Sequence, residues 1–165
     1  LVPLEEIEGI EPTLALLFSE ADTSRCGSRL LVDRLFEIVL IQVLRWVIDH
    51  PAEAGISQGM MMGLSDPRLA KSLIALHDNP KDDWSLDKMA STAGMSRSAF
   101  ATAFKSAIGT TPAAYLMDWR LSVATSMLRS GRPVKQVAED LRFAAASTFS
   151  KAFRRRTGTS PRGVR

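Results

Sequence analysis

The C-terminal half of the chain carries two clusters of hydroxyl-bearing and basic side chains, each interleaved with phenylalanines at helical spacing. Phe100 and Phe104 are one helical turn apart, and so are Phe149 and Phe153, so each pair would anchor the apolar back of a helix. Such polar side chains donate hydrogen bonds to phosphate oxygens and base edges, and the basic ones neutralise phosphate charge, which points to contact with a polyanion. The polar fronts would consist of Arg97, Ser98, Thr102 and Lys105 in the first cluster, and of Ser147, Thr148, Lys151, Arg154, Arg155 and Arg156 in the second.

The sequence offers no catalytic or metal-binding constellation. A single cysteine, Cys26, excludes an intrachain disulfide and a thiolate zinc cluster. The two histidines, His50 and His77, end predicted helices, where they are expected to cap the chain rather than bind metal. The sequence contains no glycine-rich phosphate loop and no supported Ser/His/Asp arrangement. We therefore predict that the protein is not an enzyme and uses no metal or cofactor.

Charge is divided unevenly along the 165 residues. The net charge is +3, yet residues 1–80 carry 6 basic and 12 acidic side chains, whereas residues 81–165 carry 15 and 6. An acidic half joined to a basic half suggests two roles, one of which is contact with a polyanion. Hydrophobic residues make up 45% and charged residues 24%, which indicates a folded globular chain. The acidic start lacks the basic region of a signal peptide.

Helical patterns account for almost the whole chain and predict an all-α fold. A short apolar helix is expected from Pro12 through Phe18, ending near Asp22-Thr23-Ser24. A longer one over 28–49 is apolar on nearly all sides and therefore needs cover on nearly all sides. Charged residues interrupt this longer helix, so it is not expected to span a membrane. Residues 51–65, rich in glycine and methionine, are expected to form a linker. Asp66-Pro67 then begins a region in which N-cap residues and glycines mark the helix ends.

The two polar clusters lie in two copies of one pattern. Each copy reads as a short helix, a tight turn and a second helix, which is the helix-turn-helix arrangement whose second helix enters the major groove of DNA. A long helix over 112–130 would separate the copies, so the recognition helices at about 97–107 and 146–156 would need major-groove segments about one turn (~34 Å) apart. In the first helix of each copy and the residue that ends it, Leu86, Ala90 and Gly94 match Val134, Ala138 and Arg142 at an offset of 48 residues. In the second helix, Phe100 and Phe104 match Phe149 and Phe153 at an offset of 49. The turn of the second copy therefore holds one extra residue.

Four motifs of this region are typical of a known family. They are Trp84-Ser85-Leu86-x-x-x-Ala90, Gly94-Met95-Ser96-Arg97-Ser98-x-Phe100-x-x-x-Phe104, Gly109-x-x-Pro112-x-x-Tyr115-Leu116-x-x-Trp119-Arg120 and Phe149-Ser150-Lys151-Ala152-Phe153-Arg154-Arg155-x-x-Gly158-x-Ser160-Pro161. With these motifs, residues 66–165 resemble the C-terminal DNA-binding domain of AraC/XylS-type transcription regulators. Residues 1–62 resemble, more weakly, the helical tail of the cupin-like effector domain that precedes it in one subgroup. The resemblance implies a helical effector or dimerisation remnant at 1–50, a linker at 51–65 and a seven-helix double helix-turn-helix domain at 66–165.

The resemblance also implies which residues would contact DNA. Alanine offers a base edge no hydrogen bond, so sequence readout is expected to depend on Ser98, Thr102, Ser147 and Lys151. The expected base contacts are Ser98, Ala101, Thr102, Ala146, Ser147 and Lys151, and the expected phosphate contacts are Ser96, Arg97, Lys105, Thr148, Arg154 and Arg155.

The partners implied by the resemblance are those of a bacterial regulator of transcription in the cytoplasm, associated with the nucleoid when bound. They are double-stranded DNA and, if the protein activates transcription, RNA polymerase. A second copy of the chain, bound through helix 28–49, is expected from the unusually apolar surface of that helix. A small-molecule effector is not expected to bind within this chain, and no membrane contact is expected. The charge pattern leaves one alternative, a helical adaptor whose basic helices dock on an acidic partner protein.

The second copy departs from the family pattern at two positions. Arg142 stands where the turn normally has glycine, and Ala145 stands where the recognition helix normally has a Ser or Asp N-cap. A non-glycine residue in the left-handed region costs about 1 kcal/mol, and a lost capping oxygen costs about 0.5–2 kcal/mol. We therefore expect the second copy to be locally less stable than the first and to order more fully on DNA. Arg142 could alternatively be an additional phosphate contact.

Overall fold

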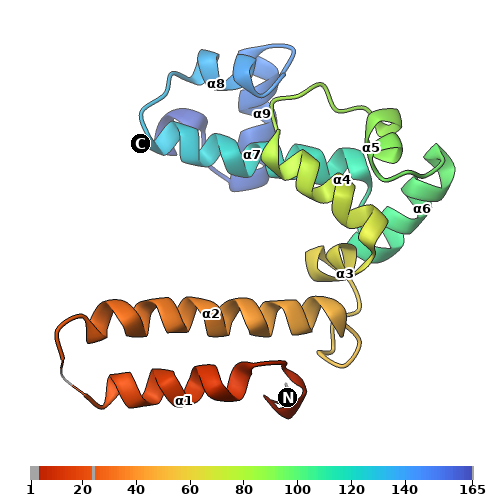
Figure 1. Cartoon of the computed structure of the whole chain (residues 1–165). Coiled ribbons are helices and arrows are strands. Elements are labelled where there is room, and N and C mark those ends of the chain that lie inside the picture. Colours follow the sequence, from red (N-terminus) through yellow and green to blue (C-terminus); the bar gives the residue numbers. More distant parts are fainter. Residues whose placement is uncertain (1–3, 24, 165) are drawn as a thin grey trace. The chain divides into compact units, whose positions relative to one another are not determined.

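A computed structural model describes residues 4–23 and 25–164 (Figure 1). The described residues contain helices and no strand, which confirms the all-α prediction. The chain divides between Ser65 and Asp66 into two compact units, residues 1–65 and 66–165. No described helix is long and apolar enough to cross a membrane.

The first unit is a helical hairpin with a small core. The helices α1 (Ile10–Ala21) and α2 (Ser28–Asp49) lie side by side after a 3-10 turn, η1 (Leu4–Glu6), as Figure 1 shows. Ile7, Ile10 and Trp46 form the buried centre of this hairpin. The first helix begins two residues earlier than expected, because its first turn starts at Ile10 and packs into this core. It ends at Ala21, close to the predicted end near Asp22, and α2 has the predicted bounds.

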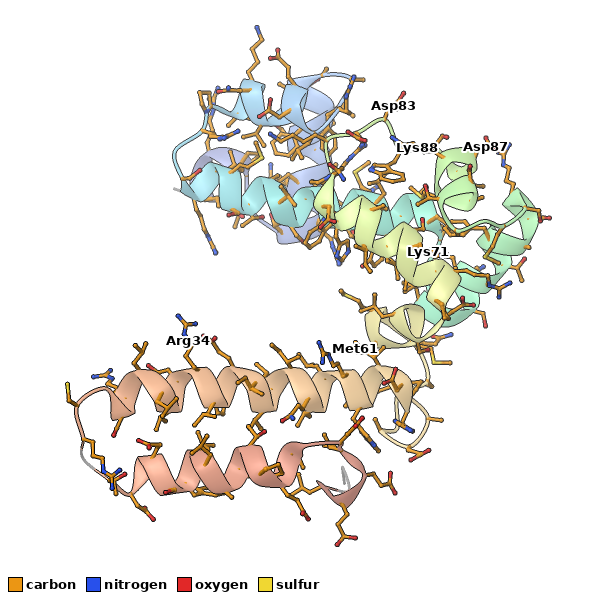
Figure 2. The ribbon with its side chains drawn as sticks, in the orientation of Figure 1. Arg34, Met61, Lys71, Asp83, Asp87 and Lys88 are labelled. Atoms are coloured by element: carbon orange, nitrogen blue, oxygen red, sulfur yellow. The ribbon has the colours of Figure 1, made fainter. Side chains whose placement is uncertain are left out.

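Helix α2 is mostly uncovered within its own unit. Only Ser28, Leu35 and Trp46 of its 22 residues are buried. Figure 2 shows Arg34 pointing away from α1, where it pairs with Glu37. The hairpin itself therefore does not bury most of the apolar side chains of α2, although the sequence predicts burial on nearly all sides of this helix. Large apolar side chains remain exposed along α2, namely Leu30, Leu31, Phe36, Ile38, Leu40, Ile41 and Leu44.

The predicted linker is partly helical. Residues 51–59 form turns and bends, whereas Met60–Ser65 form the short helix α3. Gly63 is buried in this helix, and the contacts of α3 are with α2. Of the Met60-Met61-Met62 run, Met60 is exposed, whereas Met61 and Met62 are half-buried.

The second unit is built around one long helix. It contains six α-helices and a terminal 3-10 turn, so the predicted seven helices are found only if that turn is counted. Helix α7 packs against α6 at one end and against α8, α9 and η2 at the other (Figure 1). This organisation places one helix-turn-helix on each end of α7. The bounds are α4 (Pro67–Asp78), α5 (Leu86–Thr92), α6 (Arg97–Ile108), α7 (Pro112–Arg129), α8 (Val134–Asp140), α9 (Ala146–Thr157) and η2 (Pro161–Val164).

The helix starts of the first helix-turn-helix follow the predicted capping. Asp66 accepts from the backbone N–H of Arg68, and Ser85 accepts from that of Lys88. Ser96 and Thr111 do the same for α6 and α7, at 3.3 Å each. Each oxygen satisfies a donor that the helix itself leaves unpaired, which contributes about 1 kcal/mol per cap.

Both histidines lie at helix ends, as the sequence indicates. His50 Nδ1 is 3.1 Å from the carbonyl oxygen of Trp46. His77 stacks on Trp119 at 4.1 Å between ring centroids, and its Nε2 lies 2.8 Å from Tyr115 Oη. Burial lowers the pKa of His77, so the ring stays neutral at neutral pH. His77 therefore joins α4 to α7 as a packing residue.

Candidate nucleic-acid interface

The first helix-turn-helix has a glycine turn with complete hydrogen bonding. Gly94 has φ 65° and ends α5, and its N–H donates to the Ser91 carbonyl at 3.0 Å. The Met95 N–H donates to the Ala90 carbonyl at 2.9 Å. This pair of bonds is a Schellman motif, which needs a left-handed residue at the glycine position. The turn directs α6 so that Phe100 and Phe104 are buried and its polar face is exposed.

The second helix-turn-helix repeats this turn with arginine in place of glycine. Arg142 has φ 61° and is the one non-glycine with positive φ among residues 4–23 and 25–164. Its N–H donates to the Glu139 carbonyl at 3.1 Å, and the Phe143 N–H donates to the Ala138 carbonyl at 2.9 Å. The predicted left-handed arginine is confirmed. So is the extra turn residue, because five residues separate α8 from α9 and four separate α5 from α6.

The helices of the second unit's C-terminal half also lack side-chain caps. Ala145 is the N-cap of α9 and supplies no capping oxygen, as predicted. Pro133 at the start of α8 supplies none either. In the first copy, by contrast, Ser85 and Ser96 cap both helices. Two missing caps and one strained residue, at about 1 kcal/mol each, should lower the free energy of unfolding of the second copy by a few kcal/mol relative to the first.

The structure brings each predicted set of contact residues to one exposed helix face. On α6 and its N-cap, Ser96, Arg97, Ser98, Thr102 and Lys105 are exposed. On α9, the exposed members are Ser147, Thr148, Lys151, Arg154 and Arg155. The two alanines differ from the rest, since Ala101 and Ala146 are half-buried, and Ala146 packs against the core of its own repeat. Alanine at these positions leaves base readout to its polar neighbours.

The basic residues of the two faces differ in how far they are already paired. Lys105, Lys151, Arg154 and Arg155 have no ion-pair partner among the described residues, so their charge is free for phosphates. Arg97 lies 3.6 Å from Asp87, whose place on α5 is labelled in Figure 2. Both of these side chains are exposed, so the pair is weak enough to exchange for a phosphate.

Arg156 has a different role from its two neighbours. Its Nε lies 3.0 Å from Asp118 on α7, which joins the end of α9 to the central helix. Arg156 is not among the expected phosphate contacts, and the spacing of a helix turns this third arginine of the run toward α7.

Arg142 also binds the protein itself through its side chain. Its Nε donates to the Lys81 carbonyl at 3.2 Å, in the loop that precedes α5. The phosphate contact considered from the sequence would have to displace this bond. Arg142 therefore joins the turn of the second helix-turn-helix to the loop that leads into the first.

Arg120 holds the same loop from α7. Its Nε donates to the Pro80 carbonyl at 2.9 Å, and its Nη2 donates to the Asp82 carbonyl at 2.7 Å. Burial lowers the pKa of Arg120, and the nearby charge of Arg142 lowers it further, although the carboxylate of Asp83 opposes both. Sequence reasoning named both arginines but missed these contacts, since bonds to backbone carbonyls far along the chain leave no local spacing signal.

The double role of Arg142 leads to a prediction for two variants. Arg142→Ala keeps the left-handed backbone strain and loses the bond to Lys81, so it should destabilise the second unit by about 1 kcal/mol. Arg142→Gly also loses the bond but removes strain of about 1 kcal/mol, so its stability should lie near that of the parent protein. Urea unfolding, with amide exchange over 134–156 compared against 86–107, measures both effects. Equal stability of the two variants would contradict the strain argument.

Comparisons with known proteins agree with this geometry. A helix-turn-helix domain family model matches residues 89–165, and a cupin family model matches residues 1–49. The chain is 32% identical over 155 residues to the HTH-type transcriptional regulator AlkR of Acinetobacter baylyi, covering 92% of this chain and 50% of AlkR. A crystal structure of a transcriptional regulator from Chromobacterium violaceum, described as an AraC-type DNA-binding domain-containing protein, is 27% identical with a TM-score of 0.58 and covers 61% of this chain and 91% of that one. The chain belongs to the AraC family.

The AraC-type assignment covers both units. The DNA-binding domain of AdpA, solved in complex with a target DNA, is 26% identical with a TM-score of 0.54 and covers 57% of this chain and 86% of that one. The chain spans about half the length of the curated relatives it matches. The family consists of transcription regulators, which are not enzymes, and no group of three potential metal-ligating side chains occurs within the described part of the chain.

Proposed function

We propose that this chain is the DNA-binding part of a transcription regulator and that it places α6 and α9 in adjacent major-groove segments. The observation that carries the proposal is the repeated turn geometry at the two ends of α7, with free cations on the exposed faces of both second helices. Affinity would come from phosphate neutralisation by Lys105, Arg154 and Arg155. Sequence preference would come from a few side chains, above all Ser98, Thr102, Ser147 and Lys151.

The double helix-turn-helix explains why the unit contains one long central helix. A single recognition helix contacts only a few base pairs, and a second one in the next major-groove segment doubles the surface available for readout. Because α7 carries one copy at each end, it would set the spacing of the two readouts. The relation to AdpA, whose domain was solved with DNA, supports the same interpretation.

We further propose that the first unit assembles two chains through α2. Its exposed apolar side chains, including Leu30, Phe36 and Ile41, would be covered by the same helix of a second copy. A regulator of bacterial transcription acts in the cytoplasm, on the nucleoid, and an activator would also contact RNA polymerase. Sedimentation of the chain at several concentrations tests the dimer, which should weaken when Phe36 and Ile41 are replaced by serine.

A salt series tests the DNA proposal against the adaptor alternative. Binding of random duplex DNA should weaken steeply as salt is raised, because counterions released from phosphates drive association. An adaptor specific for an acidic protein surface would show no such duplex binding. Absence of binding at low salt, or binding that salt leaves unchanged, would refute DNA recognition.

Lys151 provides a residue-level prediction of this function. Lys151→Ala removes a free, exposed donor from the face of α9, so affinity for a selected site should fall by about 1–3 kcal/mol, and preference should relax in one half of the site only. Competition against a library of site variants measures both effects. The exposed Lys135, on α8 and paired with Glu139, supplies the matched control, since Lys135→Ala should leave the preference profile unchanged.

A further inference from the structure

An apolar groove in the second unit lies beside the first recognition helix. It encloses about 770 Å³ and is walled by α5, α6 and the first half of α7. Its apolar wall includes Trp84, Leu86, Met89, Leu116 and Met117. The small side chains Ala101 and Ala113 line it as well, and their size is what leaves the space open. A volume of several hundred Å³ with an apolar lining and few polar groups is typical of a small-molecule site.

The charged groups of the groove have a single sign. Lys105 and Arg120 line it, and no aspartate or glutamate does. Lys105 has no ion-pair partner among the described residues, and Arg120 uses two donors on backbone carbonyls without meeting a carboxylate. Burial lowers the pKa of Arg120, the nearby carboxylate of Asp83 opposes this shift, and the charge of Arg142 adds to it. An anionic group entering the groove would meet two cations and no carboxylate in the lining itself.

We propose that this groove binds a small amphipathic anion, with an aliphatic or ring body against the apolar wall and one carboxylate toward Lys105 and Arg120. The sequence predicted no effector site within the chain, and the groove is the observation that changes this expectation. Hydrophobic burial would supply most of the affinity, and the charge-assisted hydrogen bonds would select acids over neutral molecules.

Such a ligand would compete with DNA. Thr102 and Lys105 line the groove and also belong to the predicted DNA-contacting face of α6. A bound carboxylate would neutralise Lys105, so ligand and DNA would each weaken the other's binding by the same factor. This competition rests on the proposed DNA function, whereas binding of the ligand to the groove does not.

Titration of the whole chain with octanoate, followed by amide chemical shifts in NMR, tests the site directly. Octanoate should shift amides near Trp84, Ala101 and Ala113 in a saturable way. Octanol, with the same chain and no charge, should bind about tenfold more weakly. Ala113→Phe fills the groove and should abolish these shifts, whereas Ala114→Phe, an equally exposed neighbour that does not line the groove, should retain them.

Three results would overturn the proposal. They are shifts confined to the exposed apolar face of α2, equal binding of octanol and octanoate, and equal behaviour of the two phenylalanine variants. If an acidic amphipathic peptide shifts the groove amides and octanoate does not, the occupant is a protein segment and the proposal is wrong.

Loss of DNA affinity on adding octanoate tests the competition separately. A chain that binds octanoate without binding DNA would refute the proposed function alone.

Discussion

Replacing both Arg154 and Arg155 by alanine should lower DNA affinity by at least about a hundredfold. Neither side chain has a partner in the described structure, and both are exposed on α9. Hydrogen bonds to charged groups contribute about 1.5–3 kcal/mol each, so two lost phosphate contacts have a large combined effect. The slope of log affinity against log salt should also become shallower by about one unit per residue.

The neighbouring Arg156 is the matched control for this experiment. It belongs to the same arginine run and is also exposed, but it pairs with Asp118 at 3.0 Å, a closer and less exposed pair than Arg97 with Asp87 at 3.6 Å. Arg156→Ala should therefore leave the salt slope unchanged and destabilise folding by at most about 1 kcal/mol. If all three arginines change the salt slope equally, the assignment of Arg156 to α7 is wrong. If the double variant keeps the parent slope, α9 does not contact phosphates.

Most of the fold was predictable from local signals in the sequence. The caps Ser85, Ser96 and Thr111 begin helices where their oxygens satisfy free N–H groups, a requirement that a few adjacent residues decide. The helix over 28–49 was predicted with the observed bounds from its length and apolar pattern, although it has no side-chain cap. The start at Ile10 was missed, because it depends on packing against Trp46, which is far along the chain.

The exposed residues of the candidate site could be predicted from the sequence, but the contacts of its arginines with the rest of the protein could not. Helical periodicity places Ser98 and Lys151 opposite the buried phenylalanines, so their exposure follows from the sequence. The partners of Arg120, Arg142 and Arg156 do not follow, because each contacts a distant loop or helix. The groove beside α6 was also missed, since a cavity depends on small side chains from three helices meeting in space.

Phe153→Ala should unfold the second helix-turn-helix while the first stays folded. Phe153 is fully buried in a cluster with Leu121, Val137, Leu141 and Phe149, which is separate from the core around Phe104. Removing a buried phenylalanine side chain costs about 3–5 kcal/mol. The second copy already lacks two caps and contains the strained Arg142, so we expect its local stability to be the smaller of the two.

Phe104→Ala provides the comparison, because Phe104 holds the equivalent position in the capped first copy and is equally buried. Amide exchange should show residues 134–156 unprotected in the Phe153 variant, with 86–107 still protected, whereas the Phe104 variant should keep partial protection in 86–107. On DNA, the Phe153 variant should lose protection of one half of the footprint only. Uniform loss of exchange protection in both variants would mean that α7 couples the two copies into one cooperative unit, and the separate-stability argument would then fail.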